Sequence, residues 1–129
     1  MTYIDGFVIV VKKGKLDDYR KMAQWGKGMW MKHGALEYFE CVGDDLNPSM
    51  GGMKMLGFSK MSKAKPGEKV VFSFIVYKNK KHRDDVNKKV MAEMSSENHQ
   101  EKWKDKPMPF DMKNMAWGGF KAIVEGRKR

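Results

Sequence analysis

The stretch Val70–Tyr77, with the sequence VVFSFIVY, predicts a buried β-strand at the centre of the molecule. All of its residues except Ser73 are apolar or aromatic. Because successive side chains of a strand point to opposite faces, both faces of this strand carry groups that pack. A strand with one face in water would alternate with polar residues. We therefore expect a layer on each side of the sheet.

Two strands and one long helix are predicted before this strand. Tyr3–Val11 is apolar on both faces from Phe7 onward and predicts a first strand, in which Gly6 indicates a bulge or a close backbone approach. Apolar residues at three- and four-residue spacing predict a helix over Leu16–His33, and Ala35–Gly43 predicts a second strand.

The helix over Leu16–His33 carries an apolar stripe that includes Tyr19 and Trp30. Trp25 lies off that stripe, so we expect it to make a contact with a partner molecule or with a neighbouring molecule in a crystal. Gly34 suits the left-handed position that ends a helix.

The rest of the chain supplies two long elements and two shorter ones. The long connection 46–68 is expected to hold a short helix or strand within Met53–Met61. A second long helix is expected from an Asn79 cap to about Ser95, followed by a short helical segment at 95–106. The last strand is predicted over Asn114–Val124.

This order predicts an α+β fold with the ferredoxin-like βαββαβ pattern in a single domain, residues 1–129. The first strand and the Val70 strand, which are the most apolar, are expected at the centre of an antiparallel sheet. Both long helices would cover one face, and the other would expose a larger apolar patch than a monomer tolerates. We therefore predict an obligate homodimer in which two sheets pack face to face.

Composition indicates a soluble, cytoplasmic protein. No apolar run approaches the ~20 residues that cross a bilayer, so we expect no membrane association. The N-terminus lacks the basic start and apolar stretch of a secretory signal. The single cysteine, Cys41, excludes an internal disulfide and is interpreted as a small core residue on a strand.

The net charge of +10 is interpreted mainly as a solubility feature. Only four of the 26 basic residues are arginines, which bind phosphates and bases better than lysines do. We expect no specific nucleic-acid partner. The alternative is weak polyanion binding through the connection that contains Lys54, Lys60, Lys63 and Lys65.

Neither a metal site nor a cofactor is expected. His33, His82 and His99 lack metal-ligand spacing, and no glycine-rich phosphate loop is present.

Glu40 is the first candidate for chemistry. It falls on the same face of an apolar strand as Tyr38 and Val42, where a carboxylate can act as a general base. The alternative is a residue at the rim or in a structural ion pair. Tyr38 and Asp44 are weaker candidates for ligand binding, and turn formation also explains Asp44.

The segment Met108–Asp111 is the second candidate region. Pro109 and the preceding Pro107 indicate a stiff loop, in which Phe110 and Trp117 would wall a pocket. Asp111 would be its polar group and is, after Glu40, the second candidate for a catalytic residue. In the alternative interpretation, Phe110 anchors the loop to the core and Asp111 caps a turn.

Several short blocks resemble the YbaA-like family, a bacterial family of unknown function. These blocks span nearly the whole chain: Asp5-Gly6-Phe7-Val8, Glu40-Cys41-Val42-Gly43-Asp44-Asp45, Val70-Val71-Phe72-Ser73, Arg83-Asp84, Met108-Pro109-Phe110-Asp111 and Gly118-Gly119-Phe120. Met112 departs from the family pattern, which has a glycine at this position. The family resembles the dimeric α/β-barrel superfamily, so the resemblance implies a dimeric barrel with pockets between sheet and helices.

Two classes of function remain open. The first is a small-molecule binder or a cofactor-independent enzyme of the dimeric α/β-barrel type, which the resemblance to that superfamily favours. The second is a non-catalytic dimeric interaction module, with weak polyanion binding through its lysine-rich surface. The sequence does not identify a substrate.

Overall fold

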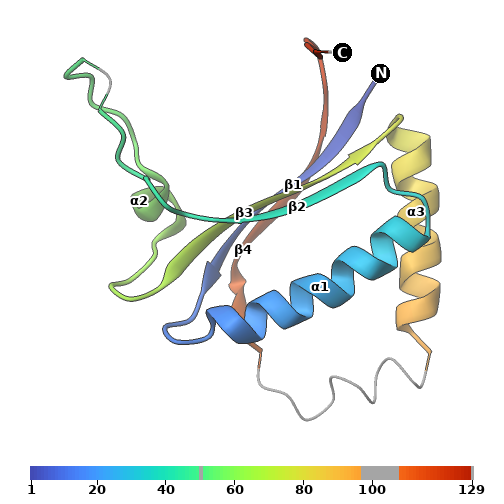
Figure 1. Ribbon diagram of the computed structural model, residues 1–129, viewed down its shortest axis with the longest axis horizontal. Coiled ribbons are helices and arrows are strands. Elements are labelled where there is room, and N and C mark those ends of the chain that lie inside the picture. The colour runs from blue at the N-terminus through green and yellow to red at the C-terminus, as the bar shows by residue number, and fades with distance from the viewer. Residues whose placement is uncertain (50, 97–107, 129) are drawn as a thin grey trace.

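The stretch Val70–Tyr77 lies in a central strand, as the sequence predicts. The computed structural model describes residues 1–49, 51–96 and 108–128. In chain order (Figure 1) the elements are β1 (Tyr3–Val11), α1 (Leu16–Lys32), β2 (Glu37–Val42), α2 (Phe58–Ser62), β3 (Lys69–Tyr77), α3 (Lys80–Met94) and β4 (Phe110–Lys121). The described residues thus form a mixed α+β fold with one four-stranded antiparallel sheet and three helices.

The sheet has the strand order β2-β3-β1-β4, with antiparallel pairing throughout. The prediction that the first strand and the Val70 strand are central is confirmed. The register pairs Phe7 of β1 with Ser73 of β3, and Ser73 with Glu40 of β2. These three residues therefore share one face of the sheet.

Helices α1 and α3 pack on the face that carries Phe7, Ser73 and Glu40, which we call the helix face (Figure 1). Two clusters of buried residues join the helices to this face. One is centred on Tyr77 with Val86 and Val90 of α3. The other consists of Ile9, Val11, Tyr19, Val71 and Phe110.

The opposite face, which we call the open face, carries exposed aromatic side chains. Phe39, Phe72 and Phe120 are 47%, 45% and 62% exposed. Helix α2 contacts this face where the ring of Phe58 meets that of Phe72, with 6.4 Å between centroids. Much of the apolar surface of β2, β3 and β4 on this side therefore remains uncovered by the described residues.

Local chemistry sets the ends of the two long helices as predicted. The side chain of Asn79 caps α3 by accepting a hydrogen bond from the backbone N–H of His82 at 2.8 Å. Helix α1 ends before Gly34, whose φ of 113° lies in the region that favours glycine.

Side chains, rather than a neighbouring backbone, lie next to the glycines of the two paired strands. A Cβ atom on Gly6 would lie 3.4 Å from the ring of Phe120, which is close to ordinary contact, whereas one on Gly119 would lie 2.9 Å from Nη2 of Arg83. The irregularity in strand pairing occurs instead between Ile9 and Val11 of β1.

Two expectations differ from the structure, and a third falls mostly outside the described residues. Strand β4 begins at Phe110 rather than Asn114, so Phe110 and Asp111 belong to a strand and not to a loop. Cys41 is exposed on the open face opposite Phe72, and the prediction of a core position is wrong because strand alternation turns it away from α1. Of the helical segment expected at 95–106, residues 97–106 lie outside the described residues, and Ser95 and Ser96 form a turn and a bend.

None of the helices within the described ranges combines the length and the apolar character that a membrane span needs.

Candidate functional site

A cavity of about 710 Å³ lies between the sheet and helices α1 and α3. We call it the main cavity. Its walls come from the helix face and from both long helices, and its volume lies within the range of about 300–1,000 Å³ that is usual for ligand sites. A space of this size can hold a small organic molecule.

Aromatic and methionine side chains form most of the wall of the main cavity. The aromatic residues are Phe7, Tyr19, Trp25, Trp30, Tyr38, Phe110 and Trp117. The methionines are Met22, Met91, Met94, Met108, Met112 and Met115. Methionine side chains are flexible, so this wall can adapt to the shape of an apolar ligand.

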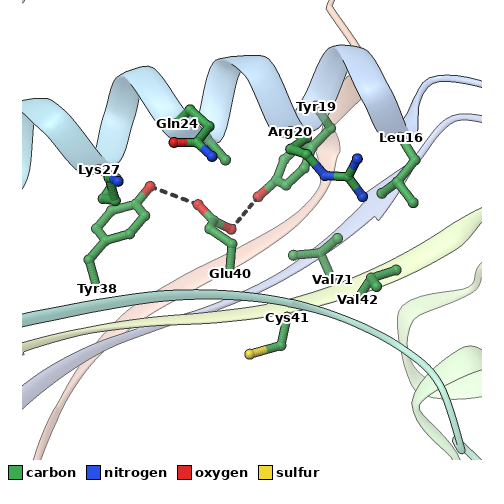
Figure 2. Close-up of a pocket in the computed structure, with 11 residues that line it drawn as sticks. Leu16, Tyr19, Arg20, Gln24, Lys27, Tyr38, Glu40, Cys41, Val42 and Val71 are labelled. Carbon is green, nitrogen blue, oxygen red and sulfur yellow. Dashed lines mark hydrogen bonds between the residues drawn. The ribbon is translucent and has the colours of Figure 1, made fainter.

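Glu40 is held in the wall of the main cavity by two tyrosines (Figure 2). The hydroxyl of Tyr19 donates to Oε1 of Glu40 at 2.6 Å, and that of Tyr38 donates to Oε2 at 2.7 Å. Tyr19 comes from the first turn of α1, and Tyr38 and Glu40 come from the same face of β2. We call this group the Glu40 clasp.

The tyrosines of the Glu40 clasp remain protonated donors. Burial raises the pKa of Tyr19 and of Tyr38 well above the ordinary value of a tyrosine, and the neighbouring charge of Glu40 raises both further. Gly26 of α1 makes this arrangement possible, because it leaves room for the hydroxyl of Tyr38 beneath the helix. The carboxylate is thereby fixed in one orientation toward α1.

A second, smaller cavity of about 310 Å³ lies on the other side of the Glu40 clasp, between α1 and β2. We call it the surface cleft. It is lined by Arg20, Gln24 and Lys27 of α1, together with Tyr19, Tyr38 and Glu40 (Figure 2). The Glu40 clasp therefore separates a cleft with basic residues from an apolar interior.

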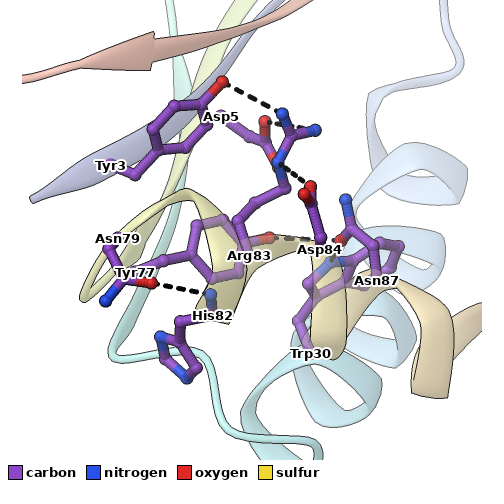
Figure 3. A network of polar contacts seen from close by, with 9 residues as sticks. All are labelled: Tyr3, Asp5, Trp30, Tyr77, Asn79, His82, Arg83, Asp84 and Asn87. Carbon is purple, nitrogen blue, oxygen red and sulfur yellow. Dashed lines mark hydrogen bonds and ion pairs between the residues drawn. The ribbon is translucent and has the colours of Figure 1, made fainter.

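A second carboxylate, Asp5, reaches the main cavity from β1. Its side chain is almost fully buried, and Oδ1 lies 3.5 Å from Nη1 of Arg83 on α3 (Figure 3). Oδ1 accepts no hydrogen bond from the described part of the chain. Burial raises the pKa of Asp5, and the positive charge of Arg83 is the largest effect that opposes the rise.

Arg83 is itself shared among several groups. Nε lies 3.2 Å from a carboxylate oxygen of Asp84, Nη2 donates to the hydroxyl of Tyr3 at 3.0 Å, and the guanidinium lies over the ring of Tyr3. Beside this group, Nε1 of Trp30 donates to Oδ1 of Asn87 at 3.0 Å (Figure 3). The network joins the start of β1 to α3 and orders one end of the main cavity.

Four of the six residues proposed from sequence lie together on the main cavity: Tyr38, Glu40, Phe110 and Trp117. Asp44 is exposed in the segment after β2. Asp111 is exposed on β4, where it accepts a hydrogen bond from the backbone of Lys113 at 3.1 Å. Neither of these two aspartates is part of the cavity wall.

Sequence reasoning missed several residues of the site. Trp25 lines the main cavity and packs against the core, so its expected position off the buried face is wrong. Asp5 and Ser73 were not proposed as site residues, although each is a polar residue in a strongly apolar strand. That contrast is the signal that would have identified them.

In the described residues, no group of three or more His, Cys, Asp or Glu side chains is arranged to hold a metal ion. The polar chemistry of the main cavity described here is instead that of separate carboxylates with tyrosine, serine and asparagine side chains.

The comparisons with known proteins place the chain in a family. It belongs to the family described as protein of unknown function (DUF1428), which matches residues 2–112. The chain is 38% identical over 125 residues to the uncharacterized protein YbaA of Escherichia coli strain K12, covering 97% of this chain and 99% of the relative. The uncharacterized protein YbaA of Shigella flexneri matches to the same extent. Membership of the family is thus confirmed, and it indicates no specific function.

Proposed function

We propose that this protein binds a small organic molecule in the main cavity. The observation that carries the proposal is the cavity itself: about 710 Å³ of space between sheet and helices, with apolar walls and a few polar groups. Ligand sites combine these two properties, because apolar contact supplies affinity and the few polar groups set orientation.

Within this proposal Glu40 is the candidate general base. A carboxylate must lie within hydrogen-bond reach of the proton that it removes. Glu40 lines the main cavity and is held there by Tyr19 and Tyr38, so a bound molecule can meet it in a defined geometry. Asp111 lies outside the cavity wall and is not part of this proposal.

The proposal includes a ferredoxin-like fold and a homodimer of the dimeric α/β-barrel kind. The strand order β2-β3-β1-β4, with α1 and α3 on one face, supports the first part. The exposed phenylalanines of the open face support the second, since face-to-face packing of two sheets would bury them.

A fluorescent apolar probe tests binding in the main cavity. We expect the neutral dye N-phenyl-1-naphthylamine to bind the wild-type protein with a rise in fluorescence. The double variant Ala23→Phe/Ser73→Phe adds two rings to the cavity wall and should weaken dye binding by about tenfold or more.

The matched control is Ser59→Phe, which adds a ring at an exposed position of α2. This variant should bind the dye as the wild type does. Dye binding that is equal in all three proteins would show that the dye does not enter the main cavity, and the absence of binding to the wild type would contradict the proposed function.

A further inference from the structure

We propose that the ligand of the main cavity is a cation: an apolar or aromatic molecule that carries a protonated amine or a similar hydrogen-bond donor. The proposal rests on the proposed function and adds the chemical class of the ligand. It follows from the charges and hydrogen-bond acceptors of the cavity wall.

The sign of charge in the main cavity is opposite to that of the chain. Basic residues outnumber acidic ones by 26 to 16 overall. Among the described residues that line the cavity, however, Asp5 and Glu40 carry negative charge, and no Lys, Arg or His is present. A negative interior in a positive protein favours a cationic ligand over an anionic one.

Arg83 offsets only part of the negative charge at this wall. Its guanidinium lies 3.5 Å from Asp5 but also 3.2 Å from Asp84, and it is not part of the cavity wall. One cation is therefore shared between two carboxylates. The Oδ1 atom of Asp5, on a residue that is 1% exposed, still accepts no hydrogen bond from the described residues.

The Glu40 clasp also retains capacity to accept hydrogen bonds. A carboxylate has about four acceptor positions, and each oxygen of Glu40 receives one tyrosine hydroxyl. Since the hydroxyls of Tyr19 and Tyr38 already donate their hydrogen bonds to Glu40, their oxygens can only accept a hydrogen bond from a ligand. The wall also contains donors, namely the hydroxyl of Ser73, the amide of Asn87 and the indole N–H groups of its tryptophans, but none of these groups carries a positive charge.

The aromatic wall suits the same class of ligand. Trp25, Trp30 and Trp117 line the main cavity, and the face of an indole ring attracts a cation within about 6 Å. An anion would meet two carboxylates. A protonated amine would meet acceptors at one end and apolar contact along its length.

Three ligands of equal ring size test the proposal by displacement of N-phenyl-1-naphthylamine at pH 7. They are 1-naphthylmethylamine, which is a cation, 1-naphthalenemethanol, which is neutral, and 1-naphthoate, which is an anion. We expect the amine to displace the dye at a concentration about tenfold lower than naphthoate, with the alcohol between them. An equal or stronger effect of naphthoate would overturn the proposal without affecting the proposed function.

Variants that remove one negative charge test whether the preference for the amine arises from Glu40 and Asp5. Glu40→Gln and Asp5→Asn should each reduce several-fold the ratio by which the amine displaces the dye better than naphthoate does. The matched control is Glu37→Gln, which removes the same charge from an exposed position of β2 outside the cavity. It should keep the full preference.

The outcomes separate the two proposals. If Glu37→Gln lowers the amine preference as much as Glu40→Gln does, the preference does not arise in the main cavity, and the inference is wrong. The order of the three ligands on the wild type decides the question even if a variant does not fold. Failure of the dye to bind the wild type would remove the proposed function and this inference together.

Discussion

The hydroxyl oxygen of Tyr38 lies 3.0 Å from the position that a Cβ atom would take on Gly26, and it donates a hydrogen bond to Glu40 at 2.7 Å. The absence of a side chain at Gly26 is therefore part of the site. An added methyl group would push the hydroxyl, and with it the carboxylate, away from α1.

The two glycines of α1 provide a matched pair of variants. Gly28 has open space around its Cβ position, so Gly28→Ala should raise the free energy of unfolding by about 0.5–1 kcal/mol through helix propensity alone. Gly26→Ala gains the same helix propensity but displaces Tyr38, so we expect its free energy of unfolding to rise less than that of Gly28→Ala, or to fall. Urea unfolding of both variants measures the difference, and equal stabilisation would show that the contact with Tyr38 is unimportant.

Replacement of Arg83 by leucine should be strongly destabilising. Asp5, whose carboxylate is almost fully buried, would lose the cation that lies 3.5 Å away. Removing one partner of a buried pair lowers the free energy of unfolding by about 3–5 kcal/mol. Urea denaturation at pH 7 measures the effect.

Arg20→Leu is the control for this substitution. Arg20 pairs with Asp17 at 3.4 Å on the exposed side of α1, where an ion pair contributes about 0–1 kcal/mol. The double variant Asp5→Asn/Arg83→Leu should recover part of the stability that Arg83→Leu loses. Equal effects of the two arginine substitutions would contradict the importance of the buried pair.

The stability of the protein in acid should depend on Glu93 of α3. This residue accepts hydrogen bonds from Lys32 and His33 at the end of α1, each at 2.8 Å, and these bonds lower its pKa to about 2. A glutamate in the unfolded chain has a pKa of about 4.3. Because the pKa of Glu93 is lower in the folded state, its ionised form stabilises the fold at pH values above about 4.3, and this contribution is lost as the pH falls toward 2. In Glu93→Gln that contribution should be missing.

Urea unfolding midpoints between pH 6 and pH 2 test this prediction. The wild-type midpoint should fall more steeply below pH 4.5 than the midpoint of Glu93→Gln. Asp17→Asn, at an exposed position of α1, serves as the control and should follow the wild type. Parallel curves for wild type and Glu93→Gln would contradict the role of Glu93.

Phe72→Glu should convert the proposed dimer into single subunits. Phe72 is 45% exposed at the middle of the open face, and a carboxylate there would be buried without a partner in a face-to-face dimer. Light scattering after size exclusion should give twice the subunit mass of 15.0 kDa for the wild type and one subunit for the variant. Met31→Glu, at an exposed position of α1, should remain dimeric.

Cys41 offers a second measurement of the same prediction. It is the sole cysteine of the sequence, and it lies opposite Phe72 on the open face. Its thiol should react slowly with a thiol reagent in the wild type and quickly in Phe72→Glu. Fast labelling of a wild-type protein that elutes as one subunit would contradict the dimer.

Local patterns determine much of this fold and therefore could be predicted. β1 matches its predicted range, and the strand over Val70–Tyr77 extends by only one residue. The caps at Asn79 and Gly34 fix the helix ends. β4 was placed too late in the chain because its first residues, from Phe110, alternate less clearly and follow two prolines.

The candidate site was only partly predictable, for a different reason. Strand alternation is enough to place Tyr38 and Glu40 on one face. The contact of Glu40 with Tyr19 and the pairing of Asp5 with Arg83 depend on how α1 and α3 cross the sheet, and no local pattern contains that information. The prediction for Trp25 fails because the side of α1 that faces the main cavity is wider than a single apolar stripe and includes Trp25.

Phe72 and Ser73 are neighbours in β3, yet one belongs to the open face and the other to the main cavity. An insertion or deletion of a single residue in this strand would exchange the two sets of side chains, placing phenylalanine where the serine hydroxyl now stands. The length of β3 is therefore constrained both by the open face and by the main cavity. Changes in chain length should be tolerated only in the segments between the strands and helices.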